Sequence, residues 1–425
     1  MRTKKGMLAC GLLTAFVCCV MEVQAGVALS NVKVQQRYPW NGKVDIWFNI
    51  AGTRQNNSVI IRALDTETGR TLDVRSLYDD NGQLILPPIK MGTGKHHIVW
   101  NADEDVEAGF KTESLAVTVS AGKYYDHPLY CVVDISGGPT AAHYPVTYLD
   151  GVPDGGWTEE YKTQKIVLRL IQPGRFIEGP NDGNTWFADN SFREVTLTKP
   201  FYMAIFETTQ AQWKNVTGTS SGGTGMDDSK SDRFGNTRPQ RVWLSTVRGN
   251  DANMAWPTSR EVDEGTFMYL LRQKTAMNGF EIPTEAQWEY ACRAGTSDNE
   301  VHQSSNGYYG HEHSQEIILN EVGSEAPNAW GLYDMLGNAG EWTIDKCEVS
   351  YGYAPVVDPK GPLDVTGIGT GPYYANSIIM RCLRGREIPG AKVFAAKARA
   401  MWYDDSKYSI NDLAAGFRII LQLEH

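Results

Sequence analysis

The chain has 425 residues, of which 21% are charged and 11% are aromatic. This composition is typical of folded protein and excludes a largely disordered chain, and the length exceeds one ordinary hydrophobic core, so we expect two domains. The formal net charge is -10. No run rich in lysine or arginine offsets this charge locally, which excludes nucleic acid as an expected partner.

Residues 1–25 have the pattern of an export signal. Three basic residues precede an apolar run from Met7 to Met21, and the sequence Val23-Gln24-Ala25 follows. A basic start, a short apolar run and small residues at the cleavage point define a secretory signal peptide, whereas a membrane span needs a longer run. We therefore expect cleavage after Ala25 and a secreted or periplasmic chain without a membrane span, carrying a net charge of about -12.

Seven cysteines are present, and three of them lie within the expected signal peptide. The other four are Cys131, Cys292, Cys347 and Cys382. None of them forms a Cys-x-x-Cys pair, so the sequence predicts neither a zinc site nor a thioredoxin-type redox motif. Two interpretations stay open for them: one or two disulfides in an oxidising compartment, or buried free thiols, as expected for Cys292 inside a predicted helix.

Residues 26–122 alternate short apolar strands with turn residues. The stretch NVKVQQRYPWNGKVDIWFNIAG predicts a hairpin around the Asn41-Gly42 turn. Four further strands are predicted in SVIIRAL, GQLILPPI, KHHIVWNA and SLAVTVSA. This spacing indicates a small all-β sandwich of immunoglobulin-like type, which we interpret as an accessory domain.

Residues 123–163 are rich in glycine, proline and aspartate and are predicted to form a connector. A second domain is expected over residues 164–424, beginning with the predicted strand KIVLRLI. Two capping boxes, Thr209 with Gln212 and Thr284 with Gln287, predict the starts of two helices in it.

Between these two helices, apolar residues at helical spacing predict a third helix, carrying Phe267, Leu270 and Leu271. The aromatic residues of the two capped helices, Trp213, Trp288 and Tyr290, are expected to belong to the hydrophobic core and not to a ligand platform.

Five motifs of this second domain resemble, in order and approximate spacing, the formylglycine-generating, sulfatase-modifying-factor domain. They are FYMAIFETTQAQW, FEIPTEAQWEYACRAGT, NAWGLYDMLGNAGEWTID, RCLRGRE and AAGFRII. The resemblance extends from about Gln164 to Leu423. It implies a C-type-lectin-like α+β fold with few regular elements, which bound calcium stabilises in characterised members.

The resemblance also implies a calcium site in the segment GLYDMLGNAGEWTID. The family's ligands in this segment are one side-chain oxygen, two backbone carbonyls and one glutamate, and they fall here on Asp334, Gly337, Ala339 and Glu341. Calcium takes six to eight oxygen ligands, and glycine at position 337 permits the tight turn that would present them. The alternative interpretation is a tight turn whose acidic side chains cap neighbouring amides.

The family's oxidases convert a substrate cysteine to formylglycine with oxygen and two active-site cysteines that bind copper(I). Soft thiolates suit copper(I) better than oxygen or nitrogen ligands do. The corresponding interval here, from Arg384 to Arg418, contains no cysteine, and Arg386 and Glu387 stand where the family motif has glycine and serine. We therefore expect no copper site of the family's kind.

Three hypotheses remain. We favour a non-catalytic member that binds a protein or glycan on the former active-site face. The second is an oxidase with a rearranged site that uses Cys347 or Cys382. The third is a different chemistry in the same groove, for which the polar candidates are Arg384, Glu387, Arg399 and Tyr403; the alternative role for these four residues is a network of surface salt bridges.

Overall fold

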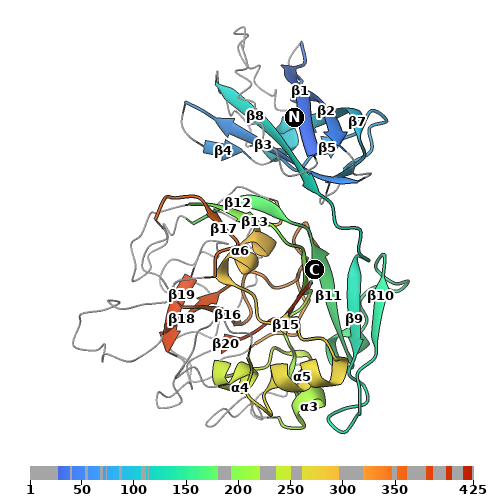
Figure 1. Ribbon diagram of the computed structural model, residues 1–425, viewed down its shortest axis with the longest axis vertical. Helices are drawn as coiled ribbons and strands as arrows, with labels where there is room; N and C mark the ends of the chain where they lie inside the picture. Colours follow the sequence, from blue (N-terminus) through green and yellow to red (C-terminus); the bar gives the residue numbers. More distant parts are fainter. Residues whose placement is uncertain are drawn as a thin grey trace, which may run out of the picture. The chain divides into compact units, whose positions relative to one another are not determined.

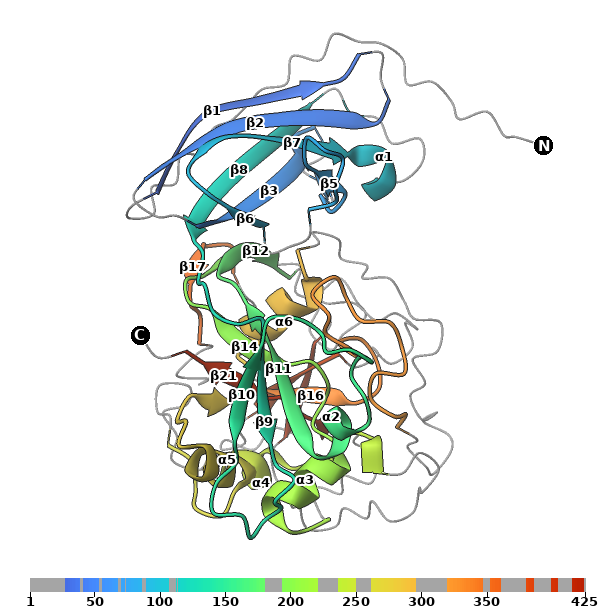
Figure 2. The same ribbon diagram turned by 90° about the vertical axis from the view of Figure 1, so that its right-hand side faces the viewer.

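The chain divides into two compact units, described separately below (Figures 1 and 2). The first consists mainly of Met1–Asp126 and the second of His127–Ile171, Arg175–Ala294 and Asn299–His425. The computed structural model describes residues 27–38, 41–52, 56–67, 70–72, 74–85, 89–106, 112, 114–179, 193–220, 236–249, 261–295, 319–346, 352–360, 380–385, 399–403 and 415–423. The expected signal peptide lies outside these residues. Within them, no helix combines the length and apolar character that crossing a membrane requires.

The first unit contains two antiparallel sheets and one short helix, α1 (Ala102–Asp105). The expected hairpin is confirmed, since β1 and β2 pair antiparallel and Gly42 between them has a φ of 76°. One sheet has the order β1 (Val27–Gln36), β2 (Lys43–Gly52), β7 (Gly94–Asn101) and β5 (Leu77–Tyr78). The other has the order β4 (Arg70–Leu72), β3 (Asn57–Asp65) and β6 (Ile89–Met91), with β8 (Leu115–Lys123) also paired to β3.

Both sheets of the first unit contribute to one hydrophobic core. Phe48 and Trp100 from the first sheet are buried in the same cluster as Ile61 and Val119 from the second. Because alternate residues of a strand point to opposite faces, each sheet buries one face against the other. This arrangement is the expected all-β sandwich.

The second unit is built around a six-stranded sheet. Its order is β10 (Val146–Leu149), β9 (Tyr130–Asp134), β11 (Lys165–Ile171), β14 (Phe201–Ala204), β21 (Ile420–Gln422) and β15 (Phe280–Glu281). Strands from both ends of the second unit's sequence therefore lie side by side. Most of the segment predicted as a connector, residues 123–163, belongs instead to the second unit, which begins at His127. It supplies β9, β10 and the short helix α2 (Glu160–Thr163) to that unit.

Two smaller sheets complete the strands of the second unit. One has the order β12 (Gly174–Glu178), β13 (Arg193–Leu197) and β17 (Val356–Val357). The other has the order β19 (Arg399–Tyr403), β18 (Met380–Arg384), β16 (Gly340–Lys346) and β20 (Ala415–Gly416). Strand β16 of the four-stranded sheet contains Glu341, the last of the four expected calcium ligands. Glu341 lies opposite Arg384 of β18 and Gly416 of β20.

The longer helices of the second unit are α3 (Gln210–Thr217), α4 (Leu244–Arg248), α5 (Phe267–Thr275) and α6 (Glu285–Arg293). Both expected capping boxes are confirmed, with the threonine and glutamine side chains bonded reciprocally to backbone N–H groups at 3.0 and 3.1 Å. The expected core aromatics Trp213, Trp288 and Tyr290 are buried. The unit is thus an α+β domain with few regular elements, as expected.

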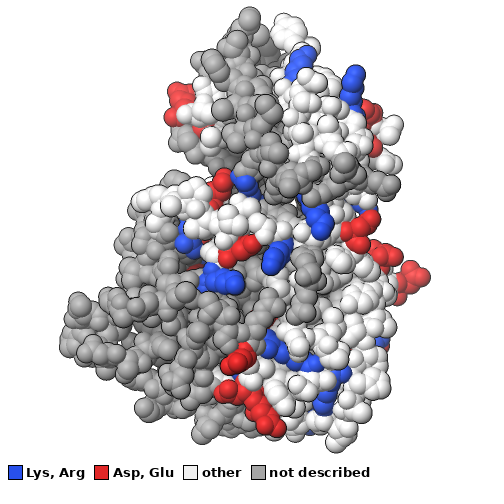
Figure 3. All heavy atoms as spheres, in the orientation of Figure 1, with Lys and Arg blue, Asp and Glu red and all other residues white. Residues whose placement is uncertain are grey.

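On the face drawn in Figure 3, acidic and basic side chains of the described residues lie interspersed and do not form one continuous basic surface.

Candidate functional site

The expected calcium loop enters β16 through a series of tight turns. Gly337 has a φ of 102°, and Asp334 and Asn338 also adopt left-handed backbone angles, with φ of 54° and 59°. Glycine reaches such angles without strain, and aspartate and asparagine tolerate them better than most residues. The N–H of Gly337 is bonded to the carbonyl of Gly385 at 2.9 Å, which ties the loop to the end of β18.

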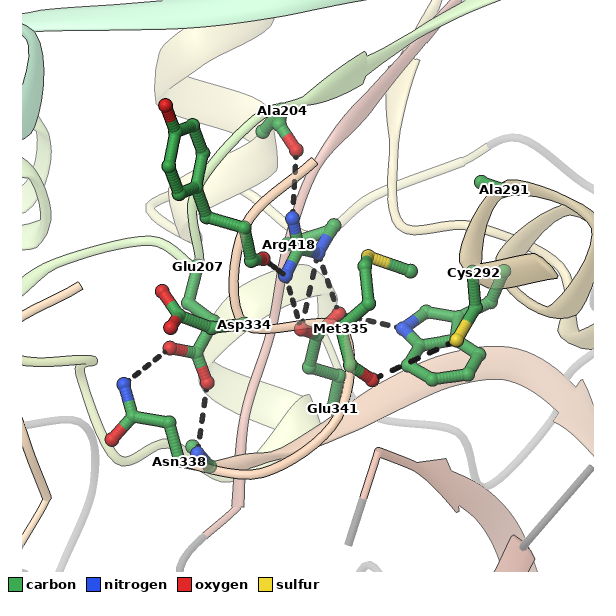
Figure 4. Close-up of polar contacts among 12 residues, drawn as sticks. Ala204, Glu207, Ala291, Cys292, Asp334, Met335, Asn338, Glu341 and Arg418 are labelled. Carbon is green, nitrogen blue, oxygen red and sulfur yellow. Dashed lines mark hydrogen bonds and ion pairs between the residues drawn. The ribbon is translucent and has the colours of Figure 1, made fainter. Parts of the chain in front are cut away.

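Glu341 forms a buried ion pair with Arg418, the residue midway between β20 and β21 (Figure 4). Arg418 Nε lies 3.0 Å from Oε1 and 2.9 Å from Oε2 of Glu341, and Nη2 lies 2.7 Å from Oε1. The indole N–H of Trp288 donates to Oε2 at 2.7 Å. All three side chains are fully buried, and a carboxylate offers about four lone-pair sites. Three N–H groups thus bind the two oxygens of Glu341, and the Nε–H of Arg418 is shared between them.

The remaining donors of Arg418 bind backbone carbonyls. Nη1 donates to Ala204 and Ile205 at 3.0 and 3.2 Å, and Nη2 donates to Tyr333 at 2.9 Å. These carbonyls belong to the end of β14 and to the loop before β16. Arg418 thus joins the central sheet, the loop and the four-stranded sheet through one side chain.

Two further carboxylates lie beside this ion pair. Glu207 accepts hydrogen bonds from Asn338 Nδ2 at 2.7 Å and from the N–H of Ala339 at 2.8 Å. Asp334 Oδ2 accepts from the N–H of Gly323 at 2.6 Å. Burial raises the pKa of Asp334 to about 6, and burial together with the charges of Asp334 and Glu341 raises the pKa of Glu207 well above its ordinary value. Burial is the largest cause of both shifts, and the charge of Glu341 adds to each of them. Three carboxylates thus lie around Arg418 in the described part of the site.

The donor set fits a calcium ion only in part. Asp334 and the loop's backbone carry oxygen ligands of the kind that calcium prefers, and the excess negative charge favours a cation. Both oxygens of Glu341, in contrast, already accept hydrogen bonds from Arg418 and Trp288. Among the described residues no group of three or more histidine, cysteine or acidic side chains is arranged to hold a metal. Calcium at Asp334, Gly337, Ala339 and Glu341 therefore stays a prediction.

Sequence reasoning missed Glu207 and Arg418 as parts of this site. Both lie within motifs that the sequence displays, Glu207 in FYMAIFETTQAQW and Arg418 in AAGFRII. In each motif a charged residue lies directly beside an apolar run, and a charged side chain at such a position usually requires a buried partner. The sequence alone does not say which partner, because Glu341 and Arg418 are 77 residues apart.

The structure places Arg384 differently from the groove hypothesis. This residue ends β18 and is fully buried, with Nη2 at 2.8 Å from Glu285 Oε1 and 2.9 Å from Glu289 Oε2, both on α6. Arg384 therefore belongs to an internal ion-pair cluster and is not an exposed groove residue or part of a surface network. Arg399 pairs with Arg384 across the β18–β19 ladder, and Tyr403 ends β19, but the structure describes only their backbone.

The other groove candidate, Glu387, lies outside the described residues.

Two of the four cysteines are described with their side chains, and both are buried free thiols. Cys131 lies on β9 and Cys292 on α6. Burial raises the pKa of Cys131 to about 12 and that of Cys292 further, so neither thiol ionises near neutral pH. The buried-thiol interpretation of Cys292 is confirmed. Cys347 lies outside the described residues, and only the backbone of Cys382, in β18, is described.

The second unit is an α+β domain of mostly short strands, in which the buried side chain of Arg418 fixes the tight loop before β16 to the central sheet. Comparison with protein families matches residues 158–423 to the "Sulfatase-modifying factor enzyme 1-like domain". This match covers more than half of the chain, and the chain belongs to this family.

Three relatives match parts of the chain. The formylglycine-generating enzyme of Bos taurus is 33% identical over 101 residues, which are 20% of this chain and 27% of that enzyme. The inactive C-alpha-formylglycine-generating enzyme 2 of Bos taurus is 25% identical over 238 residues, covering 46% of this chain and 76% of that protein. The chaperone protein LppX of Paenibacillus barcinonensis is 25% identical over 204 residues, covering 41% and 70%. The alignment with the active enzyme thus spans about a quarter of its length.

Two solved structures are similar to the chain. Treponema denticola variable protein 1 is 21% identical, with a TM-score of 0.41 and coverage of 61% of this chain and 96% of that protein. PvdO from Pseudomonas aeruginosa is 20% identical, with a TM-score of 0.38 and coverage of 60% and 94%. Family membership rests on the sequence match and not on these likenesses.

Proposed function

We propose that this chain is an exported, non-catalytic member of the sulfatase-modifying factor family that binds a protein or glycan ligand on the face corresponding to the family's active site. The observation that carries the proposal is the lack of any cysteine in the sequence from Arg384 to Arg418. Copper(I) chemistry of the family's kind requires two thiolates close together, and this interval cannot supply one.

The described thiols do not replace the missing pair. Cys131 and Cys292 are 0% and 1% exposed and lie on different elements, one in the central sheet and one in α6. Since burial keeps both protonated, neither is available as a soft thiolate ligand. A relocated oxidase site would have to use Cys347 and Cys382, the two cysteines named in the second hypothesis.

The relatives give this proposal further support. One of them is named as an inactive formylglycine-generating enzyme and another as a chaperone protein. This chain matches both of these relatives over a larger share of their length than it matches the formylglycine-generating enzyme of Bos taurus. The third hypothesis loses support, because Arg384 is committed to Glu285 and Glu289 inside the domain.

A copper(I) competition titration tests the metal part of the proposal. The mature chain is titrated against a chromophoric copper(I) chelator under reducing conditions, and we expect it to withdraw no stoichiometric copper. Variants Cys382→Ser and Cys347→Ser serve as matched controls and should behave as the wild type does. One tightly bound copper(I) per chain that either substitution abolishes would instead support a relocated oxidase site.

Calcium is part of the proposal as a structural ion of the loop, and chelation tests it. If calcium binds only the folded chain, a concentration one hundred times the dissociation constant stabilises that chain by about 2.7 kcal/mol. We therefore expect EDTA to lower the melting temperature and calcium to restore it. Asp334→Asn should remove the response while keeping an acceptor for the N–H of Gly323.

Glu341→Gln is a poor probe of calcium, because it also removes the partner of Arg418. The calcium assignment is wrong if EDTA leaves the wild-type melting temperature unchanged and elemental analysis of the purified chain finds no calcium.

Ligand binding and export are tested separately. The mature chain is probed on a glycan array, and binding that a soluble competitor glycan abolishes would establish the glycan form of the proposal. Export is tested by expressing the full chain and measuring the mass of the secreted or periplasmic product, for which cleavage after Ala25 is expected.

A further inference from the structure

Glu178 is a buried carboxylate with only one of its two oxygens engaged. It ends β12, and its side chain is 1% exposed. Oε2 accepts a hydrogen bond from Arg193 Nε on the neighbouring strand β13 at 2.7 Å. Oε1 is buried and has no hydrogen-bond partner among the described residues. An ionised carboxylate in such a position lacks the additional hydrogen bonds that normally compensate its removal from water.

The described acidic side chains near Glu178 are Glu285 and Glu289 of α6. Both already bind arginine side chains. Glu289 Oε1 accepts from Arg293 Nε and Nη2 at 2.8 and 2.6 Å and from the N–H of Gly179 at 3.1 Å. Arg384 on β18 binds Glu289 Oε2 at 2.9 Å and Glu285 Oε1 at 2.8 Å. Arg384 and Arg293 thus stabilise the charges of Glu285 and Glu289, and among the described residues Arg193 is the cation that binds Glu178 directly.

We propose that the folded domain holds Glu178 as a neutral carboxylic acid at mildly acidic pH and that release of this proton at higher pH loosens the junction of β12, β13 and α6. The inference is independent of the proposed ligand-binding function. It makes the second unit a pH-sensitive element, since a buried negative charge is created beside Glu289 and Glu285 when the proton leaves.

The burial of Glu178 and the acidic groups beside it favour its neutral form. Burial is the largest effect and raises the pKa of Glu178 to about 7 from an ordinary value of 4.5. The charge of Arg193 opposes this shift, the charges of Glu289 and Glu285 add to it, and Arg384 opposes it weakly. Because the folded chain then binds the proton more tightly than the unfolded chain, its stability falls as the pH rises from about 4.5 to about 7 and stays at the lower level above that range.

Thermal and urea unfolding of the mature chain at pH 5.5 and pH 8 test the proposal with the variant Glu178→Gln. Glutamine keeps the shape of the neutral acid and an acceptor for Arg193, but it does not titrate. The variant should therefore be more stable than the wild type at both pH values, and its advantage in the unfolding equilibrium constant should be at least about tenfold larger at pH 8 than at pH 5.5.

Glu289→Gln is the matched control on the same cluster. Because Glu289 accepts charge-assisted hydrogen bonds from Arg293 and Arg384, this variant should be destabilised at both pH values. A second readout is the infrared carbonyl band of protonated carboxyl groups at pH 5.5, which should be weaker in Glu178→Gln than in the wild type, because Glu207 and Asp334 contribute to this band in both proteins.

The proposal is overturned if Glu178→Gln is destabilised equally at both pH values, since Glu178 would then act as an ionised partner of Arg193. Failure of Glu178→Gln to fold at pH 5.5 would overturn it as well, because an isosteric neutral side chain must be tolerated where a neutral acid is bound.

Discussion

Arg418→Ala is expected to lower the free energy of unfolding of the second unit by about 3–5 kcal/mol or more, the cost of breaking a buried ion pair by removing one partner. The substitution leaves Glu341 charged and buried, with the indole N–H of Trp288 as its remaining partner among the described residues. It also removes the hydrogen bonds to three carbonyls, which belong to the end of β14 and to the loop before β16. Urea unfolding of the mature chain measures the loss.

Two control variants show whether the loss of stability comes from the buried ion pair. Glu160→Gln removes the 2.8 Å ion pair between Lys165 and Glu160, in which the Glu160 side chain is 44% exposed, and it should cost less than about 1 kcal/mol. Arg418→Lys keeps the charge but cannot reproduce the forked contacts, so its stability should lie between those of the wild type and the alanine variant. An alanine variant no less stable than Glu160→Gln would show that Arg418 does not fix the loop.

Trp213→Ala is the second substitution with a large expected effect, about 3–5 kcal/mol of unfolding free energy. Trp213 on α3 is 2% exposed and stacks on Phe267 of α5, with ring centroids 5.4 Å apart and an angle of 9° between the planes. Phe417 contacts both rings edge-on. Alanine therefore leaves a cavity where two helices and the C-terminal segment meet.

The matched variant Trp213→Phe retains a ring against Phe267 and should cost clearly less than Trp213→Ala. Denaturant midpoints of both variants, with the slope of the transition unchanged, would establish the order. Equal stability of the alanine variant and the wild type would contradict the position of Trp213 in the core.

Local features of both units could be predicted from the sequence, because the residues that determine them are close together in the chain. Each capping box joins residues three positions apart, such as Thr284 and Gln287, and both have the expected bonds. The hairpin at Gly42 similarly depends on neighbouring turn residues. Sequence motifs also suffice for the family, since five of them occur in the family's order.

The connector prediction failed because composition outweighed a short apolar run. Glycine, proline and aspartate surround β9, and the strand itself, Tyr130–Asp134, is short and almost continuously buried, so it lacks the alternation that marks a half-exposed strand. Only its pairing with β11 and β10 identifies it as part of the central sheet.

The sequence motif identifies the loop of the candidate site but not the contacts that the loop makes. The loop and its four residues were identified from a motif, whereas the ion pair of Glu341 with Arg418 and the role of Glu207 depend on contacts between distant segments. The same reason explains Arg384, whose burial against α6 depends on the packing of β18. A charged residue in a motif does not show whether it lies in a groove or inside an ion-pair cluster.

The central claim is that this family member does not oxidise cysteine, and a turnover assay tests it most directly. The mature chain is supplied with copper(I), oxygen, a reductant and a cysteine-containing sulfatase peptide, and mass spectrometry follows the loss of sulfur from the peptide. Because the interval from Arg384 to Arg418 offers no thiolate and Met401 as its only soft donor, we predict no aldehyde above the copper-only control. Turnover above that control, abolished by Cys347→Ser or Cys382→Ser, would contradict the account and identify an oxidase with a relocated site.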